Sequence, residues 1–240
     1  MGFDDLHRKR QGNLRKRKSE IKELEPLRFL IVCEGEKTEP NYFEALRKKL
    51  NDKYRKNFVT LKVECVDIIG RGRNTESLVE YTKKIRDNAI IGYGNIWCVF
   101  DKDSFKAEQF NGAITKAKNE NIKVAWSNEA IELWFLLHFE YISSGITRDQ
   151  YITKLNTHFK NYGINNGKYS KNLTNIYDIL ENYGSYSKAI KFAKRLEELH
   201  RGQTPSNSKP MTKVYELIEE LKKLLEKGAV AFFNSSHKKC

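Results

Sequence analysis

Residues 29–39 read FLIVCEGEKTE, and this stretch decides the fold. Five apolar residues run without interruption into Glu34, Gly35 and further acids. An unbroken apolar run of this length is typical of a strand that is covered on both faces, as in a parallel sheet. Ligands of such sheets bind at the carboxyl ends of the strands. The sequence places Glu34 at such an end.

The same pattern returns at residues 96–104, IWCVFDKDS, where an apolar run ends in Asp101 and Asp103. Residues two apart in a strand point to the same side, so we expect the two carboxylates to lie together. Crowded carboxylates raise one another's pKa unless a cation neutralises them. Mg²⁺ accepts one or two protein carboxylates and keeps water ligands for a substrate phosphate. The two stretches predict a site for Mg²⁺ or Mn²⁺ that includes Glu34, Asp101 and Asp103.

Strand-like and helix-like segments alternate through the first 126 residues. The predicted strands are 27–33, 58–69, 96–100 and 122–126, and the predicted helices are 41–50, 76–88 and 108–118. This order predicts an α/β fold with a parallel four-stranded sheet, right-handed crossovers and flanking helices. Residues 130–141 are apolar nearly all round and are predicted to form one buried helix. Further helices are predicted at 151–159, 173–180, 186–199 and 214–225.

The predicted organisation has four parts: a flexible basic arm at 1–25, a catalytic domain at 26–145, a helical region at 146–228 and a tail at 229–240. The arm carries seven Lys and Arg residues between Arg8 and Lys18, and the chain has a formal net charge of +13. A balance of this size indicates a polyanionic partner, such as nucleic acid. The arm is either a phosphate-binding segment or a solvated tail.

Cysteine usage and hydropathy indicate the compartment. The four cysteines lack CxxC spacing, and three of them fall in apolar runs, where cysteine acts as a small hydrophobic residue. This usage favours a reducing compartment and argues against a zinc site. No apolar run reaches the 18 or so residues of a membrane span, and the first residues lack a signal-peptide core. We expect a cytoplasmic protein that does not associate with a membrane.

Two polar residues stand out in the apolar segment at 130–141. Glu132 needs a partner if it is buried, and either a second metal ion or a Lys or Arg side chain would supply one. Glu129, three residues earlier, is expected to be more exposed. His138 lies on a different helical face from Glu132, and it is either a hydrogen-bonded core residue or a functional one.

Basic residues near the predicted strand ends are candidates for nucleic-acid binding. They are Lys37, Arg71, Arg73, Lys168 and Lys171. Arginine and lysine in such loops can hold phosphate, although the same residues also suit an ordinary solvated turn. Tyr169, between two of the lysines, could stack on a base.

The combination of motifs resembles a known family. A strand that ends in Glu34-Gly35, followed two β-α units later by one that ends in Asp101-x-Asp103, resembles the Toprim domain of topoisomerases, primases and the OLD nucleases. The longer stretches VCEGEKTEPNYF (32–43), FDKD (100–103) and SNEAIELWFLLHF (127–139) resemble the RloB/AbiLii-like proteins of bacterial phage defence, over roughly residues 27–225.

The resemblance implies a Toprim-like Rossmannoid domain with Mg²⁺-dependent phosphodiester chemistry, and often a partner ATPase encoded alongside. Glu34 would take the role of the Toprim glutamate, and Asp101 and Asp103 the metal roles. Toprim sequences commonly carry another acid four residues after the glutamate. Thr38 stands there in this chain, so the supporting acid is either Glu36 or Glu39. We take Glu39 as the further metal ligand and Glu132 as the further catalytic candidate.

The leading hypothesis is a metal-dependent endonuclease of antiviral defence, or abortive infection, that cleaves DNA or RNA, with tRNA among the candidate substrates. One alternative is a haloacid-dehalogenase-like phosphatase with a nucleophilic aspartate in Asp101-x-Asp103. That chemistry places its aspartate pair after the first strand, whereas here the pair follows the third. The other alternative is a non-catalytic nucleic-acid-binding or regulatory subunit. The sequence leaves the activating trigger and the oligomeric state open.

Overall fold

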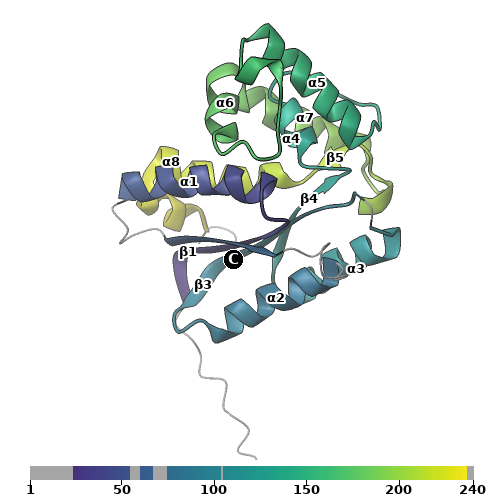
Figure 1. The fold of residues 1–240 in the computed structure, drawn as a ribbon. Helices are drawn as coiled ribbons and strands as arrows, with labels where there is room; N and C mark the ends of the chain where they lie inside the picture. The colour runs from purple at the N-terminus through teal and green to yellow at the C-terminus, as the bar shows by residue number, and fades with distance from the viewer. Residues whose placement is uncertain (1–23, 55–59, 67–74, 104, 237–240) are drawn as a thin grey trace, which may run out of the picture.

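A computed structural model describes residues 24–54, 60–66, 75–103 and 105–236, and a five-stranded sheet runs through its middle (Figure 1). The strand order is β2-β1-β3-β4-β5. The strands are β1 (Leu24–Glu34), β2 (Thr60–Val66), β3 (Gly92–Asp101), β4 (Lys123–Asn128) and β5 (Met211–Thr212). The first four are parallel, which confirms the predicted sheet. The short β5 pairs antiparallel with β4, an addition that the sequence pattern did not predict.

Helices cover both faces of the sheet. Figure 1 shows α1 (Thr38–Tyr54) on one face, and α2 (Thr75–Asn88) and α3 (Ala107–Asn119) on the other. The side chains of β1 alternate between these layers. Phe29, Ile31 and Cys33 pack with α1, whereas Leu30 and Val32 pack with α2 and α3. The internal strand β1 is therefore buried on both faces, as its unbroken apolar run predicts.

The prediction of one long helix at 130–141 is wrong. Residues 130–138 are buried, but only Glu132–Leu136 forms a helix, α4. The chain then turns, because the amides of His138 and Phe139 bond three residues back, to the carbonyls of Phe135 and Leu136. The His138 carbonyl accepts a hydrogen bond from the Ser185 amide at 2.9 Å, so a distant segment holds the turn in place.

The C-terminal helices pack against α1 and the face of the sheet that α1 covers (Figure 1). They are α5 (Arg148–Asn161), α6 (Ile176–Tyr183), α7 (Tyr186–Leu199) and α8 (Val214–Ser236), with short 3-10 turns at Asn165–Gly167 and Pro205–Asn207. Glu181 of α6 ties this packing together, because it pairs with Lys49 of α1 and with Lys222 of α8. One continuous apolar cluster joins β1, α1 and these helices.

Several predicted features lie partly or wholly outside the described residues, or close to where these end. The helix α8 continues to Ser236, into the range predicted as the tail. Residues 1–23 of the basic arm, and the turn with Arg71 and Arg73, lie outside the described residues. The predicted boundary at residue 146 stays a prediction. None of the described helices combines the length and the apolar character needed to span a membrane.

Candidate functional site

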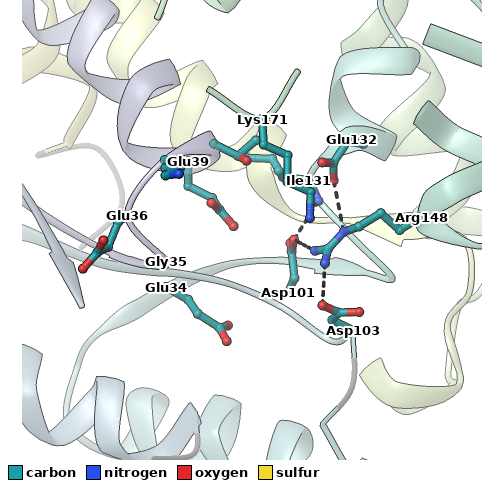
Figure 2. Close-up of a pocket in the computed structure, with 12 residues that line it drawn as sticks. Glu34, Gly35, Glu36, Glu39, Asp101, Asp103, Ile131, Glu132, Arg148 and Lys171 are labelled. Atoms are coloured by element: carbon teal, nitrogen blue, oxygen red, sulfur yellow. Dashed lines mark hydrogen bonds and ion pairs between the residues drawn. The ribbon is translucent and has the colours of Figure 1, made fainter. Parts of the chain in front are cut away.

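The carboxyl ends of β1 and β3 form one side of a pocket with a volume of about 310 Å³ (Figure 2). Cys33 pairs with Val99 in the parallel register, so Glu34 and Asp101 follow on neighbouring strands. The structure therefore brings together the acids that the two sequence stretches placed at strand ends. The lining residues are Glu34, Gly35, Glu36, Lys37, Thr38, Glu39, Asp101, Asp103, Ile131, Glu132, Arg148 and Lys171.

The turn from β1 into α1 aims a second acid at the pocket. Gly35 has a φ of +79°, a left-handed conformation that glycine adopts without strain. The helix then begins at Thr38, so Glu39 falls in its first turn, where a negative charge is favourable. Glu39 is buried, whereas Glu36 is exposed. Of the two acids that the sequence left open, Glu39 is the one placed to support the site.

The Asp-x-Asp segment is anchored to the chain that leaves β4. Asp101 is buried, and its Oδ2 accepts a hydrogen bond of 3.0 Å from the backbone amide of Ile131. The backbone amide of Asp103 donates to the Glu129 carbonyl at 3.0 Å. These bonds hold both aspartates beside the start of α4, so Glu132 reaches the same pocket.

Arg148 is the principal site residue that sequence reasoning missed. It is the first residue of α5, and its guanidinium lies among three acids (Figure 2). Nη2 is 2.9 Å from Asp101 Oδ2, Nη1 is 2.5 Å from Asp103 Oδ2, and Nε is 3.5 Å from Glu132 Oε2. A signal was present in the sequence. Thr147 and Gln150 form a capping box, which puts Arg148 in the first helical turn, where a positive charge is unfavourable without an acidic partner.

Glu132 is fully buried and has a second partner. The Tyr169 hydroxyl donates a hydrogen bond of 3.2 Å to Glu132 Oε1. Arg148 and Tyr169 together supply the partners that a buried acid needs. The suggestion that Tyr169 stacks on a base is wrong, because its ring is buried against Phe135 and Phe159.

The pocket contains more negative charge than its one arginine neutralises. Burial, reinforced by the charge of Asp101, raises the pKa of Glu34 to about 8. Burial also raises the pKa of Asp101 to about 7. The charge of Arg148 opposes this rise only in part, and the charge of Glu132 adds to it. The pKa of Glu39 is raised as well, by burial and then by Asp101. Glu34 Oε2 is buried and accepts no hydrogen bond from the described residues.

These features fit a hard divalent cation by the chemistry of the donors. Carboxylate oxygens are the preferred ligands of Mg²⁺, and the orphaned oxygen of Glu34 has ligand capacity to spare. As the side chains are placed, however, no three His, Cys, Asp or Glu groups in the described ranges converge closely enough to hold a metal ion. Arg148 occupies the space between Asp101, Asp103 and Glu132. The donor set suits a cation, and an arginine now neutralises part of it.

The other candidates are more dispersed. Lys37 and Lys171 line the pocket and are exposed, whereas Lys168 is exposed outside it. Glu129 is partly buried and pairs with Lys209, so it is less exposed than expected. His138 is a core residue: its Nδ1 lies 2.9 Å from the Trp134 carbonyl, and its ring meets the Trp134 ring edge-on.

Comparison with known proteins identifies a family. The family model described as RloB-like protein matches residues 29–221, which is well over half of the chain. This range contains all of the acids in the pocket, together with Arg148 and Tyr169. No curated protein matches the chain, and no solved structure matches it.

Proposed function

The chain belongs to the RloB-like protein family, and we propose that it is a Toprim-type, Mg²⁺- or Mn²⁺-dependent endonuclease that hydrolyses phosphodiester bonds in DNA or RNA. The observation that carries this proposal is the meeting of Glu34 and Asp101 at neighbouring parallel strand ends, both buried and both with raised pKa values. Buried acids at such an edge are costly unless they serve a ligand or a reaction.

The roles of the side chains follow from their positions. Asp101 and Asp103 would hold the cation, Glu39 would be a further ligand, and Glu132 would be a further catalytic residue. When bound, a divalent cation stabilises charge on the phosphodiester and favours ionisation of the attacking water. Burial raises the pKa of Glu34 to about 8 in the cation-free protein, which suits a group that gains and loses a proton near neutral pH. Glu34 can accept the proton of the attacking water or donate one to the leaving oxygen as the phosphorus–oxygen bond breaks.

Charge at the pocket suits a nucleic-acid substrate. Lys37 and Lys171 line the pocket and are exposed, and in this proposal they would contact phosphates on either side of the reacting one. The formal net charge of +13 would add non-specific attraction for a nucleic-acid backbone. The family resemblance further suggests a cytoplasmic antiviral role, an abortive-infection response and a partner ATPase, with tRNA as one candidate substrate.

One observation favours the alternative of a non-catalytic nucleic-acid-binding or regulatory subunit. Arg148 already pairs with both Asp101 and Asp103, so part of the charge that a cation would balance is balanced by the protein itself. A subunit of this kind would bind nucleic acid in the same way with or without magnesium.

The decisive experiment compares wild type with Glu34→Gln, and uses the exposed Glu36→Gln as the matched control. Cleavage of plasmid, single-stranded DNA and tRNA is measured in Mg²⁺ and in Mn²⁺, with and without the neighbouring ATPase. Binding is measured by fluorescence anisotropy in Ca²⁺. We expect Glu34→Gln to bind as wild type does and to lose on the order of a hundredfold in cleavage rate. Equal cleavage by the two proteins would refute the role of Glu34, and binding without cleavage by wild type under every condition would favour the non-catalytic subunit.

A further inference from the structure

Arg148 stands where the proposed function places a cation. Its guanidinium spans both acids of the Asp-x-Asp segment, with contacts of 2.9 Å to Asp101 and 2.5 Å to Asp103, and it approaches Glu132 at 3.5 Å. An arginine fork that bridges two carboxylates is a strong pairing. A divalent cation held by Asp101 and Asp103 would compete with Arg148 for the same carboxylate groups.

The pairing is incomplete at its third contact. Arg148 Nε and Glu132 Oε2 are both buried, and neither makes a hydrogen bond within the described structure. The 3.5 Å between them is an ion-pair distance rather than a good hydrogen bond. Arg148 therefore balances part of the negative charge but makes no hydrogen bond to Glu132 Oε2. Glu132, the most deeply buried of the acids, keeps an oxygen that can still bind a ligand.

The position of Arg148 at the start of α5 is unfavourable for a positive charge, so its ion pairs with the acids keep the guanidinium in place. At the first residue of α5, a positive charge faces the positive end of the helix dipole. The guanidinium and a divalent cation would also repel each other at a few ångströms. When a cation binds the aspartates, these ion pairs of Arg148 are lost. Its long side chain is then free to turn toward the exposed Lys171, which also lines the pocket.

We propose that Arg148 is the resident counter-ion of the carboxylate cluster, that it competes with the divalent cation for Asp101, Asp103 and Glu132, and that the released guanidinium binds a phosphate of the substrate. This inference rests on the proposed function and adds two things to it: an exchange of cations, and a phosphate ligand that is withheld from nucleic acid until the metal ion is bound.

The first test is the affinity for Mn²⁺, measured by isothermal titration calorimetry on the full chain without nucleic acid. Arg148→Gln removes the competing charge, and Arg86→Gln is the matched control, since Arg86 pairs with Asp87 and Glu120 away from the pocket. We expect Arg148→Gln to bind Mn²⁺ at least tenfold more tightly than wild type, which corresponds to about 1.4 kcal/mol. Arg86→Gln should match wild type.

Arg148→Lys guards against misfolding of the glutamine variant. It keeps a positive charge, but an ammonium group cannot bridge two carboxylates as the fork does, so its Mn²⁺ affinity should lie between those of wild type and Arg148→Gln. Circular dichroism confirms that each variant is folded. Equal or weaker Mn²⁺ binding by both folded Arg148 variants would overturn the competition and leave a metal-dependent enzyme intact. No Mn²⁺ binding by any of the proteins would overturn the exchange and the proposed metal dependence together.

The second test addresses the phosphate ligand. Anisotropy of a labelled single-stranded oligonucleotide is measured in EDTA and in Ca²⁺. We expect Arg148→Gln to match wild type in EDTA, where Arg148 is held by the aspartates, and to bind several-fold more weakly in Ca²⁺. The same ratio of affinities in both conditions would overturn the release of Arg148 onto phosphate, whatever the Mn²⁺ result.

Discussion

The hydroxyl of Tyr169 donates a hydrogen bond of 3.2 Å to Oε1 of Glu132, which joins the segment before α6 to the carboxylate cluster. Both residues are buried, so water does not replace the bond when it is lost. The contact shows that the pocket is supported from the C-terminal helical region as well as from the strand ends.

We predict that Tyr169→Phe lowers the free energy of unfolding by roughly 1–3 kcal/mol, because the substitution leaves a buried carboxylate oxygen without its donor. Urea unfolding measures the change. Tyr183→Phe is the control, since that side chain is substantially exposed and its loss of a hydroxyl should have little effect. An equal loss of unfolding free energy in the two variants would show that the hydrogen bond to Glu132 does not stabilise the fold.

Asp101→Asn should separate stability from metal binding. The amide keeps an acceptor for the Ile131 amide but removes a charge that burial makes costly. We predict that the metal-free variant is at least as stable as wild type at pH 8. Saturating Mg²⁺ should raise the melting temperature of wild type and of the exposed Asp149→Asn control, but not that of Asp101→Asn. A magnesium shift that persists in Asp101→Asn would place the cation elsewhere.

His138 predicts a dependence of stability on acidity away from the pocket. Burial is the main cause that lowers its pKa to about 4; the hydrogen bond to the Trp134 carbonyl opposes burial in part, and the charge of Lys222 acts in the same direction as burial. The unfolded chain binds this proton below about pH 6.5, whereas the folded chain binds it only near pH 4. The contribution of His138 is therefore complete above pH 6.5 and is lost as the pH falls toward 4, on the order of 3 kcal/mol in total.

The measurement is the urea midpoint at pH 7.5 and at pH 4.5 for wild type and His138→Gln. Glutamine can still bond to the Trp134 carbonyl but does not titrate, so the drop between the two pH values should shrink. Other groups titrate in both proteins and cancel in the comparison. His200→Gln, at the end of α7, should behave as wild type. An unchanged drop in His138→Gln would mean that the fold does not lower the pKa of His138.

The basic arm should contribute affinity rather than chemistry. Seven positive charges between Arg8 and Lys18 would release counterions from a nucleic acid, so removal of residues 1–20 should flatten the slope of log affinity against log salt. The single-turnover cleavage rate at saturating protein should stay the same. A slope that does not change would show that the arm is a solvated tail.

The strand ends could be predicted from sequence because their signals are local. The run from Phe29 to Cys33 is apolar at every position, and this requires burial on both faces, which α1 on one side and α2 with α3 on the other provide. Parallel strands present their carboxyl ends at one edge, so the convergence of Glu34 and Asp101 follows from the order of the elements.

The features that sequence reasoning missed depend on distant contacts. Arg148 and Tyr169 reach the pocket from another region, and no local periodicity reports which acid a remote side chain will meet. The early end of α4 has the same origin. Residues 130–141 satisfy the pattern of a buried helix, but the bond from the Ser185 amide to the His138 carbonyl fixes a turn that only the folded chain can impose.

The short strand β5 comes from the C-terminal helical region but belongs to the sheet of the N-terminal region, so it links the two regions. Met211 and Thr212 extend the sheet beside β4, and the Thr212 hydroxyl lies 3.0 Å from that of Ser127, just before the segment that carries Glu132. A fragment that stops at residue 145 would keep the acids and lose the edge strand, Arg148 and Tyr169. A gene that carried the sheet without the helical region would therefore encode a cluster of negative charge that lacks its partners. We expect the two regions to be inherited together.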